Sequence, residues 1–332
     1  MFVVHALWSP GRGVLLWAED GDRPATGRSR ALRTARPHPF AAPAETLAAL
    51  HPGKPTQVTL LLPAHPGGPA PSPELVRSAP VAPRGEPGLR PWAVPAVAVD
   101  PAELDDPADE LRYGASVAHL RAVAAFADDL ARRGHALPTL DRAGRVACAR
   151  WRPVVQGVDL ATVEALATAM PPVARAEVGT GPADPAALVA DALDVLVDAA
   201  VRDRLARAGV AHHGGRGAVD AWLTALTSPD GRLPARTRSG PLAEALQSWD
   251  EVGTEPPGAA RACFRLAEVR ALAEEFDDTG DGTHWRLEFL LQSTTDPSLL
   301  VPAAQVWTGA ADRLIAGPQE VLLAELGRAA RV

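Results

Sequence analysis

The acidic segment Asp277–Glu288 has the spacing that comes closest to a metal site. One glycine and three carboxylates fall at positions 1, 5, 6 and 12 of a calcium-binding loop: Asp277, Asp281, Gly282 and Glu288. However, position 3 is Thr279, and position 8 is His284 where an apolar residue would be expected. The residues that follow alternate like a strand and do not resemble an exiting helix. We therefore expect a polar hairpin turn without metal ligands.

Three aspartates could supply paired carboxylates for acid–base or metal chemistry. Asp191, Asp194 and Asp198 recur at helical spacing, so they share one face of a helix. That face lies opposite an apolar stripe, and Asp198 is spaced to pair with Arg202. The pattern is typical of a solvated helix face, which is what we expect.

Two adjacent histidines, His212 and His213, could bind a metal. They precede Gly214-Gly215, and no carboxylate or thiol lies nearby at ligand spacing. The pattern indicates a loop between two helices.

Motifs for nucleotide binding and hydrolysis are missing from the sequence. A phosphate-binding loop ends in Gly-Lys-Ser or Gly-Lys-Thr, but the single Gly-Lys pair, Gly53-Lys54, is followed by Pro55, which removes a needed N–H donor. The sequence has no acidic box to hold Mg²⁺ and no Gly-x-Ser-x-Gly motif, and neither Cys148 nor Cys263 has a nucleophile context. We therefore expect no catalytic, cofactor-binding or metal-ligating residues in this chain.

The first 62 residues have the pattern of a small β-rich module. Phe2–Trp8 and Val14–Ala18 are β-prone runs joined by a Pro-Gly-Arg-Gly turn, and Gln57–Leu62 adds a third apolar run. Prolines then recur every few residues up to about Val99. Because proline has no N–H to donate to a ladder, we expect residues 63–101 to be a linker or a long loop.

Residues 102–332 are predicted to be mainly helical, with a short antiparallel β unit near 262–292. Asp caps a helix and Pro suits its first turn, so the Asp-Pro pairs at 106–107 and 184–185 mark two helix starts. Shorter helices are expected after Asp159, at 219–227, at 242–249 and after Gly317-Pro318, and strands at 262–269 and 285–292. The predicted fold class is α+β.

The composition is that of a globular protein with an acidic balance. The 332 residues are 47% hydrophobic and 22% charged, and the net charge is −7. A protein that grips nucleic acid by itself presents a basic face, and this balance argues against one. Eight tryptophans could stack on bases, but most lie among aliphatic residues, where core packing is expected. With no signal-peptide pattern and no apolar run of about 18 residues, we expect a cytoplasmic protein without membrane contact.

Several segments resemble one protein family. Thr283–Trp307, THWRLEFLLQSTTDPSLLVPAAQVW, is similar to the signature of a helicase-associated domain ahead of the motor in bacterial Swi/Snf-family, DEAD/DEAH-like ATPases. Phe2–Asp20 looks like the start of the same proteins, and Arg150–Val154 looks like an internal match. Cys263–Leu266 fits as the strand before the signature hairpin. The matches run from residue 2 to residue 307, so the resemblance covers almost the whole chain.

The resemblance implies that the chain is the non-catalytic N-terminal accessory region of such an ATPase. In the family the helicase core lies downstream, so ATP and Mg²⁺ are expected on the parent motor and not on this chain. The expected partners are the helicase motor domain, in the same or a separate chain, and double-stranded DNA or RNA reached through the motor. The resemblance also implies that the region continues past Val332, so that the chain is a fragment.

Two alternatives stay open on the sequence. The chain could be a free-standing protein-interaction module without a motor, or an independent enzyme of unrecognised chemistry. An enzyme needs a pocket in which polar groups with perturbed pKa values converge, and the sequence offers no candidate. The acidic balance favours docking on a motor or another protein over direct binding to DNA.

Overall fold

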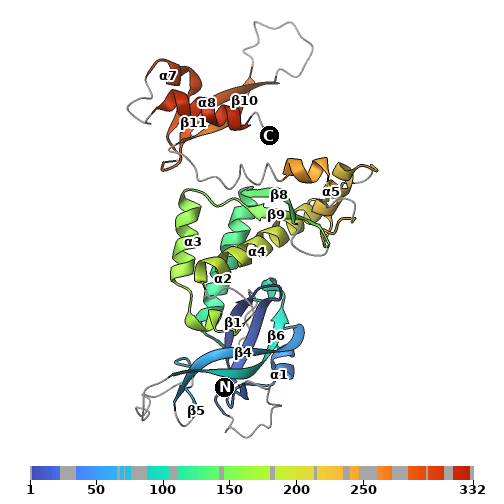
Figure 1. Cartoon of the computed structure of the whole chain (residues 1–332), viewed down its shortest axis with the longest axis vertical. Helices are drawn as coiled ribbons and strands as arrows, with labels where there is room; N and C mark the ends of the chain where they lie inside the picture. The colour runs from blue at the N-terminus through green and yellow to red at the C-terminus, as the bar shows by residue number, and fades with distance from the viewer. Residues whose placement is uncertain are drawn as a thin grey trace.

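The protein has an α+β fold, as the sequence predicts. The computed structural model describes residues 2–22, 35–65, 68–70, 72–75, 88–104, 111–141, 146–179, 184–212, 215–234, 240–246, 260–270, 283–296, 298–309 and 317–329. Along the long axis in Figure 1, an N-terminal sheet lies at one end, helices fill the middle, and a small C-terminal sheet with two helices lies at the other end.

The N-terminal sheet begins with the predicted strand–turn–strand unit. β1 (Phe2–Ser9) and β2 (Gly13–Asp20) pair antiparallel along their whole length. The strand order is β5-β4-β6-β2-β1-β7, and β3 also pairs with β6. The remaining strands are β3 (Arg36–Pro37), β4 (Gly53–His65), β5 (Gly68–Pro69), β6 (Gly88–Val99) and β7 (Arg112–Tyr113).

Both faces of β1 and β2 are buried, which explains their nearly continuous apolar sequence. Val4 and Leu16 face a core shared with the middle helices, whereas Leu7 and Trp17 face a second core under β4 and β6. Successive side chains of a strand point to opposite faces, so each strand serves both cores. Short helix α1 (Ala44–Ala48) and the 3₁₀ turn at Pro101–Leu104 flank this sheet.

The expectation of a linker or loop over residues 63–101 is wrong for most of the described part. β4 continues to His65, and β6 pairs with β4 from Gly88 to Val99. The β-rich module therefore extends well past residue 62.

The prolines of these strands fall where a ladder tolerates them. On β6, the carbonyl of Ala93 accepts a hydrogen bond from the N–H of His38, so the backbone of Ala93 faces away from β4. Backbone groups alternate in direction along a strand, so Pro91 and Pro95, two residues on either side of Ala93, also face away from β4. On β4, the carbonyl of Pro63 accepts from Ala70, which likewise lies away from β6. The missing N–H groups therefore lie outside the β4–β6 ladder.

The middle of the molecule is helical, but it also contains a hairpin that the sequence did not predict. Its helices are α2 (Ala115–Arg132), α3 (Val158–Thr168), α4 (Pro185–Arg207), α5 (Ala218–Thr227) and the 3₁₀ turn Pro172–Arg175. The hairpin joins β8 (Ala136–Asp141) to β9 (Cys148–Pro153). α2 packs against β1 and α4 packs against α2, and both supply much of the first core (Figure 1).

The predicted helix starts are confirmed in one case and shifted in another. Asp184 caps α4 by accepting the N–H groups of Ala186 and Ala187, and Pro185 occupies the first turn. The pair at 106–107 lies outside the described residues, and α2 begins later, at Ala115. The helices expected at 219–227 and after Gly317-Pro318 are confirmed.

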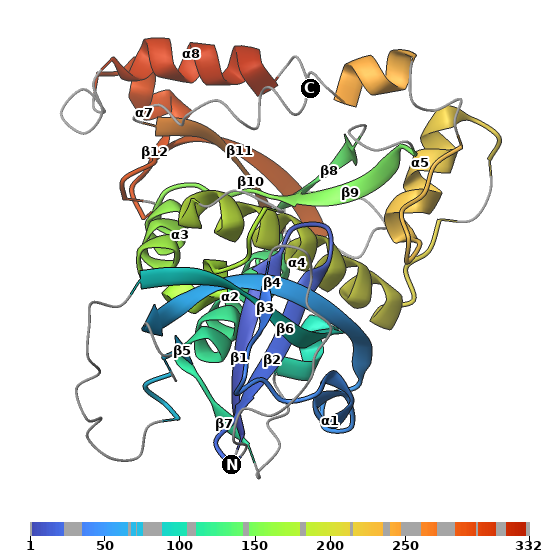
Figure 2. The same cartoon turned by 60° about the horizontal axis from the view of Figure 1, so that its bottom comes forward.

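The C-terminal part contains the predicted antiparallel unit near 262–292. β10 (Ala260–Arg270) pairs with β11 (Thr283–Ser293), which pairs with β12 (Leu300–Pro302). α7 (Ala303–Trp307) and α8 (Pro318–Ala329) follow. Figure 2 shows both helices on the side of this sheet away from α3 and α4.

Candidate functional site

The solvated face that the sequence predicts holds for Asp194, which is exposed, but not for Asp191 and Asp198, which are half-buried. Asp191 accepts a 2.6 Å hydrogen bond from the indole N–H of Trp8, and Asp198 accepts the backbone N–H of Trp151 at 2.8 Å. Desolvation raises the pKa of Asp194 above its ordinary value, and Asp191 adds to the effect, although Arg152 opposes it. Asp191 and Asp198 therefore connect α4 to β1 and β9, and sequence spacing cannot show these partners.

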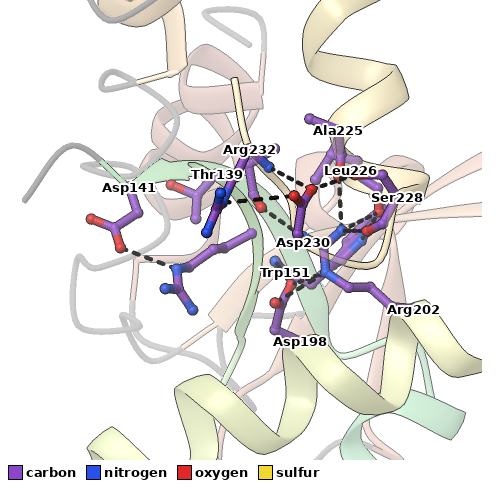
Figure 3. A network of polar contacts seen from close by, with 12 residues as sticks. Thr139, Asp141, Trp151, Asp198, Arg202, Ala225, Leu226, Ser228, Asp230 and Arg232 are labelled. Atoms are coloured by element: carbon purple, nitrogen blue, oxygen red, sulfur yellow. Dashed lines mark hydrogen bonds and ion pairs between the residues drawn. The ribbon is translucent and has the colours of Figure 1, made fainter. Parts of the chain in front are cut away.

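Asp198 belongs to the densest polar network of the middle region, which Figure 3 shows around Arg202. The Nε of Arg202 donates to both carboxylate oxygens of Asp198 at 3.0 Å. Its Nη1 donates to the carbonyls of Ala225, Leu226 and Ser228 at 2.5–3.1 Å.

The network is structural, because every nitrogen of the guanidinium already donates to a group of the fold. Nη2 of Arg202 donates to the carbonyl of Ala149 at 2.6 Å. The cation therefore binds the carbonyls at the C-terminus of α5, where the helix dipole favours positive charge, and joins α5 to α4 and β9. Gly231 is required beside it: its φ is +63°, and a Cβ there would lie 2.5 Å from the Ala149 oxygen.

The other sequence candidates also have structural partners. His212 lies in the loop between α4 and α5, as predicted, with its Nε2 3.2 Å from Oδ1 of Asp220. Gly53 and Lys54 begin strand β4, opposite Val99 and Ala98. The carboxylate of Glu288 accepts bonds from the guanidinium groups on either side of it, Arg265 and Arg286.

Two sequence candidates lie outside the described part of the chain: His213, and residues 277–282 of the calcium-like pattern. In the part that is described, no group of three or more His, Cys, Asp and Glu side chains is arranged to hold a metal ion. None of the helices described there combines the length and hydropathy needed to cross a bilayer.

The prediction of core packing is confirmed for four tryptophans. The buried ones are Trp8, Trp17, Trp92 and Trp222. Trp151 is half-buried and donates its indole N–H to Leu226, whereas Trp307 at the end of α7 is 55% exposed.

A buried polar cluster lies on one face of strands β1 and β2, and no sequence motif marks it. The Nε2 of His5 lies 3.2 Å from Oε2 of Glu19, and Glu19 also accepts the backbone N–H of Ser72. Burial alone would raise the pKa of Glu19, but the bonds from His5 and Ser72 outweigh burial and hold it below its ordinary value. The signal in the sequence is the presence of His5 and Glu19 within the otherwise apolar runs that form β1 and β2.

His38 is the least satisfied member of this cluster. It is 5% exposed, its ring packs edge-on against Trp17 and Trp92, and neither ring nitrogen has a hydrogen-bond partner. Burial lowers its pKa from 6.5 to about 4, although the charge of Glu19 opposes the shift. With His5, Glu19 and His38 all at most 5% exposed, the cluster is closed to solvent in this structure.

A contiguous exposed apolar surface lies on the β10–β11 hairpin. We call it the hairpin patch and define it by four residues: Phe264, Leu266, Leu287 and Phe289. These side chains are 46–61% exposed. Phe264 lies directly opposite Phe289, with ring centroids 5.5 Å apart, and Leu266 lies opposite Leu287. Contiguous exposed apolar side chains of this kind mark interaction surfaces.

The hairpin patch continues a face whose other end is covered. Leu291 lies two residues beyond Phe289, so its side chain points to the same face. It is fully buried together with Ala260, Val306 of α7 and Leu322 of α8. The two helices therefore cover one end of the hairpin and leave the patch bare.

Comparison with protein-family models, with curated proteins and with solved structures finds no match to this chain. The candidate sites are therefore interpreted from their own geometry.

Proposed function

We propose that this chain is the non-catalytic N-terminal accessory region of a Swi/Snf-type, helicase-like, DNA-dependent ATPase. In this function it docks on the motor, and the motor supplies ATP binding, Mg²⁺ and contact with double-stranded nucleic acid. The sequence resemblance over residues 2–307 is the basis of the proposal.

The hairpin patch is the structural observation that best supports docking. The family-like segment Thr283–Trp307 forms β11, β12 and α7, so it belongs to one continuous unit. Two of the four patch residues, Leu287 and Phe289, lie inside this segment. A docking region needs an accessible apolar surface, and this unit has one.

The patch also suits a free-standing interaction module, which is the second candidate. The independent-enzyme alternative has one supporting observation, the lowered pKa of His38. A reaction centre must admit its substrate, however, and His5, Glu19 and His38 are buried side chains. The first two proposals agree on what the chain does and differ in whether a motor accompanies it.

The test is to read the coding sequence past codon 332 and then to measure ATP hydrolysis. We expect helicase-motor motifs downstream or in a neighbouring gene, and a motor whose DNA-stimulated ATPase rate changes when residues 1–332 are deleted. The purified chain alone should not hydrolyse ATP. The absence of motor motifs in every frame and neighbour would leave the interaction module as the better proposal.

A further inference from the structure

We propose that the hairpin patch is the docking site for one amphipathic helix of a protein partner. The inference rests on the proposed function for the idea that this chain docks on a protein. It adds the surface and the kind of element that binds there.

The chemistry of the patch favours a protein over a nucleic acid. Its four side chains are hydrocarbon, so they offer a phosphate neither charge nor hydrogen bonds. The nearby cations Arg265 and Arg286 alternate with the patch residues along the strands and so lie on the opposite face, where both bind Glu288. An apolar surface of a partner is therefore the complementary occupant.

The size of the patch argues against a second copy of this chain. Half-exposed side chains of this size offer together on the order of 400 Å² of apolar surface. A stable interface buries roughly 800 Å² on each partner. The apolar stripe of a short amphipathic helix is of the right order.

The covered end of the same face shows what kind of element fits it. α8 packs there through Leu322, with Val321 and Leu326 beside it. From Ala260 in this contact to Phe264 the strand rises roughly 13 Å, and a helix is about 10–12 Å across. A second helix placed further along the strands, next to α8, would therefore lie over the patch and continue the helix-on-sheet interface that α8 begins.

The test uses a synthetic amphipathic peptide as the probe. The peptide has roughly four helical turns, is stapled to be helical, and carries leucines at i, i+3, i+4 and i+7 with Glu and Lys elsewhere. Its binding to the whole chain is followed by fluorescence anisotropy. A peptide of the same composition with scrambled leucines is the control for non-specific binding. We expect the amphipathic peptide to bind and the scrambled one to bind at least about tenfold more weakly.

Substitutions locate the binding site. Leu266→Asp is expected to weaken binding of the amphipathic peptide at least about tenfold, and Phe289→Asp on the other strand should do the same. Leu89→Asp is the matched control, because Leu89 is a strand leucine of similar exposure, 67% against 61%, outside the patch. The control should bind like the unmodified chain. Circular dichroism and the melting temperature identify any variant that has unfolded.

Three results would overturn the inference. They are equal binding by the Leu266→Asp and Leu89→Asp proteins, concentration-dependent dimers that Leu266→Asp abolishes, and binding of a short DNA duplex that Leu266→Asp abolishes. The last two would assign the patch to a second copy or to nucleic acid. The peptide test needs no motor, so it can fail while deletion of the chain still changes the motor's ATPase rate, and the reverse can also occur.

Discussion

Arg202 and His38 show two different ways of burying a titratable side chain. Arg202 is a cation whose donor nitrogens bind one carboxylate and four backbone carbonyls. His38 has no hydrogen-bond partner at either ring nitrogen and avoids a buried charge by a lowered pKa. The first arrangement stabilises the fold while charged, and the second stabilises it only while neutral.

Replacing Arg202 with Met should lower the free energy of unfolding by about 3 kcal/mol. The change leaves Asp198 without its charge partner and removes one donor from each of four carbonyls. Arg207→Met is the matched control, since Arg207 forms an ion pair with Asp203 at the same i,i+4 spacing but is 68% exposed. It should cost less than about 1 kcal/mol. Urea unfolding followed by tryptophan fluorescence measures both, and equal losses would contradict the role given to Arg202.

His38 should make stability depend on pH between about 4 and 6.5. Its folded pKa is about 4 and its ordinary value is 6.5, so the unfolded chain takes up the proton first as pH falls. Neutral His38 contributes its full stability above pH 6.5. This contribution, on the order of 3 kcal/mol, is lost as the pH falls from 6.5 through about 4. Glu19 opposes this shift and His5 adds to it.

The measurement is urea unfolding at a series of pH values for the unmodified protein and for His38→Phe. The phenylalanine keeps an aromatic ring between Trp17 and Trp92 but cannot be protonated. The pH slope between 4 and 6.5 should be smaller in the variant. Parallel curves would show that His38 does not titrate as proposed.

At the scale of elements, strand β6 shows that a proline-rich segment can form the inside of a sheet. β6 has neighbours on both sides, β4 on one and β2 and β3 on the other. Pro91 and Pro95 are four residues apart, so both point away from the long ladder with β4. A strand inside a sheet therefore tolerates several prolines when they are separated by an even number of residues, because all of them then face the same side.

New prolines in β4 should obey the same alternation. Thr56 and Gln57 are neighbours, opposite Ala96 and Pro95 respectively. Thr56→Pro removes an N–H directed at β6 and should cost about 3 kcal/mol of stability. Gln57→Pro removes an N–H directed away from β6 and should cost less than about 1 kcal/mol. Thermal unfolding of the two variants compares them directly, and the reverse order would show that the alternation is misassigned.

At the scale of the whole molecule, the chain has sheets at both ends and helices between them (Figure 1). Its conspicuous polar groups join elements to each other, and a contiguous exposed apolar surface among the described residues lies at one end, in the hairpin patch. This arrangement agrees with the proposed docking, because the surface can engage a partner while the remainder stays folded.

ATP with Mg²⁺, and separately Ca²⁺, should leave the melting temperature of the chain unchanged. A ligand that binds the folded state stabilises it by about 2.7 kcal/mol at a hundredfold excess over its dissociation constant, so a specific site would be seen. Differential scanning fluorimetry at millimolar ligand checks this. A higher melting temperature with ATP would support an independent enzyme. A higher melting temperature with Ca²⁺ would support calcium binding by residues 277–288.

The elements whose pattern is local can be predicted from the amino-acid sequence. The paired strands β1 and β2, the Asp184 cap of α4 and the β10–β11 hairpin follow from alternation, capping and turn residues, which act within a few positions. The α+β class followed from them.

The tertiary structure decided what each element faces. The strand β6, the partners of Asp191 and Asp198, the isolated His38 and the bare hairpin patch all depend on contacts between segments that are distant in the chain. The apolar alternation of β10 and β11 is the same whether a helix covers it or not. Which part is buried under α8 and which stays exposed depends on where α8 packs, and local sequence patterns carry no such information.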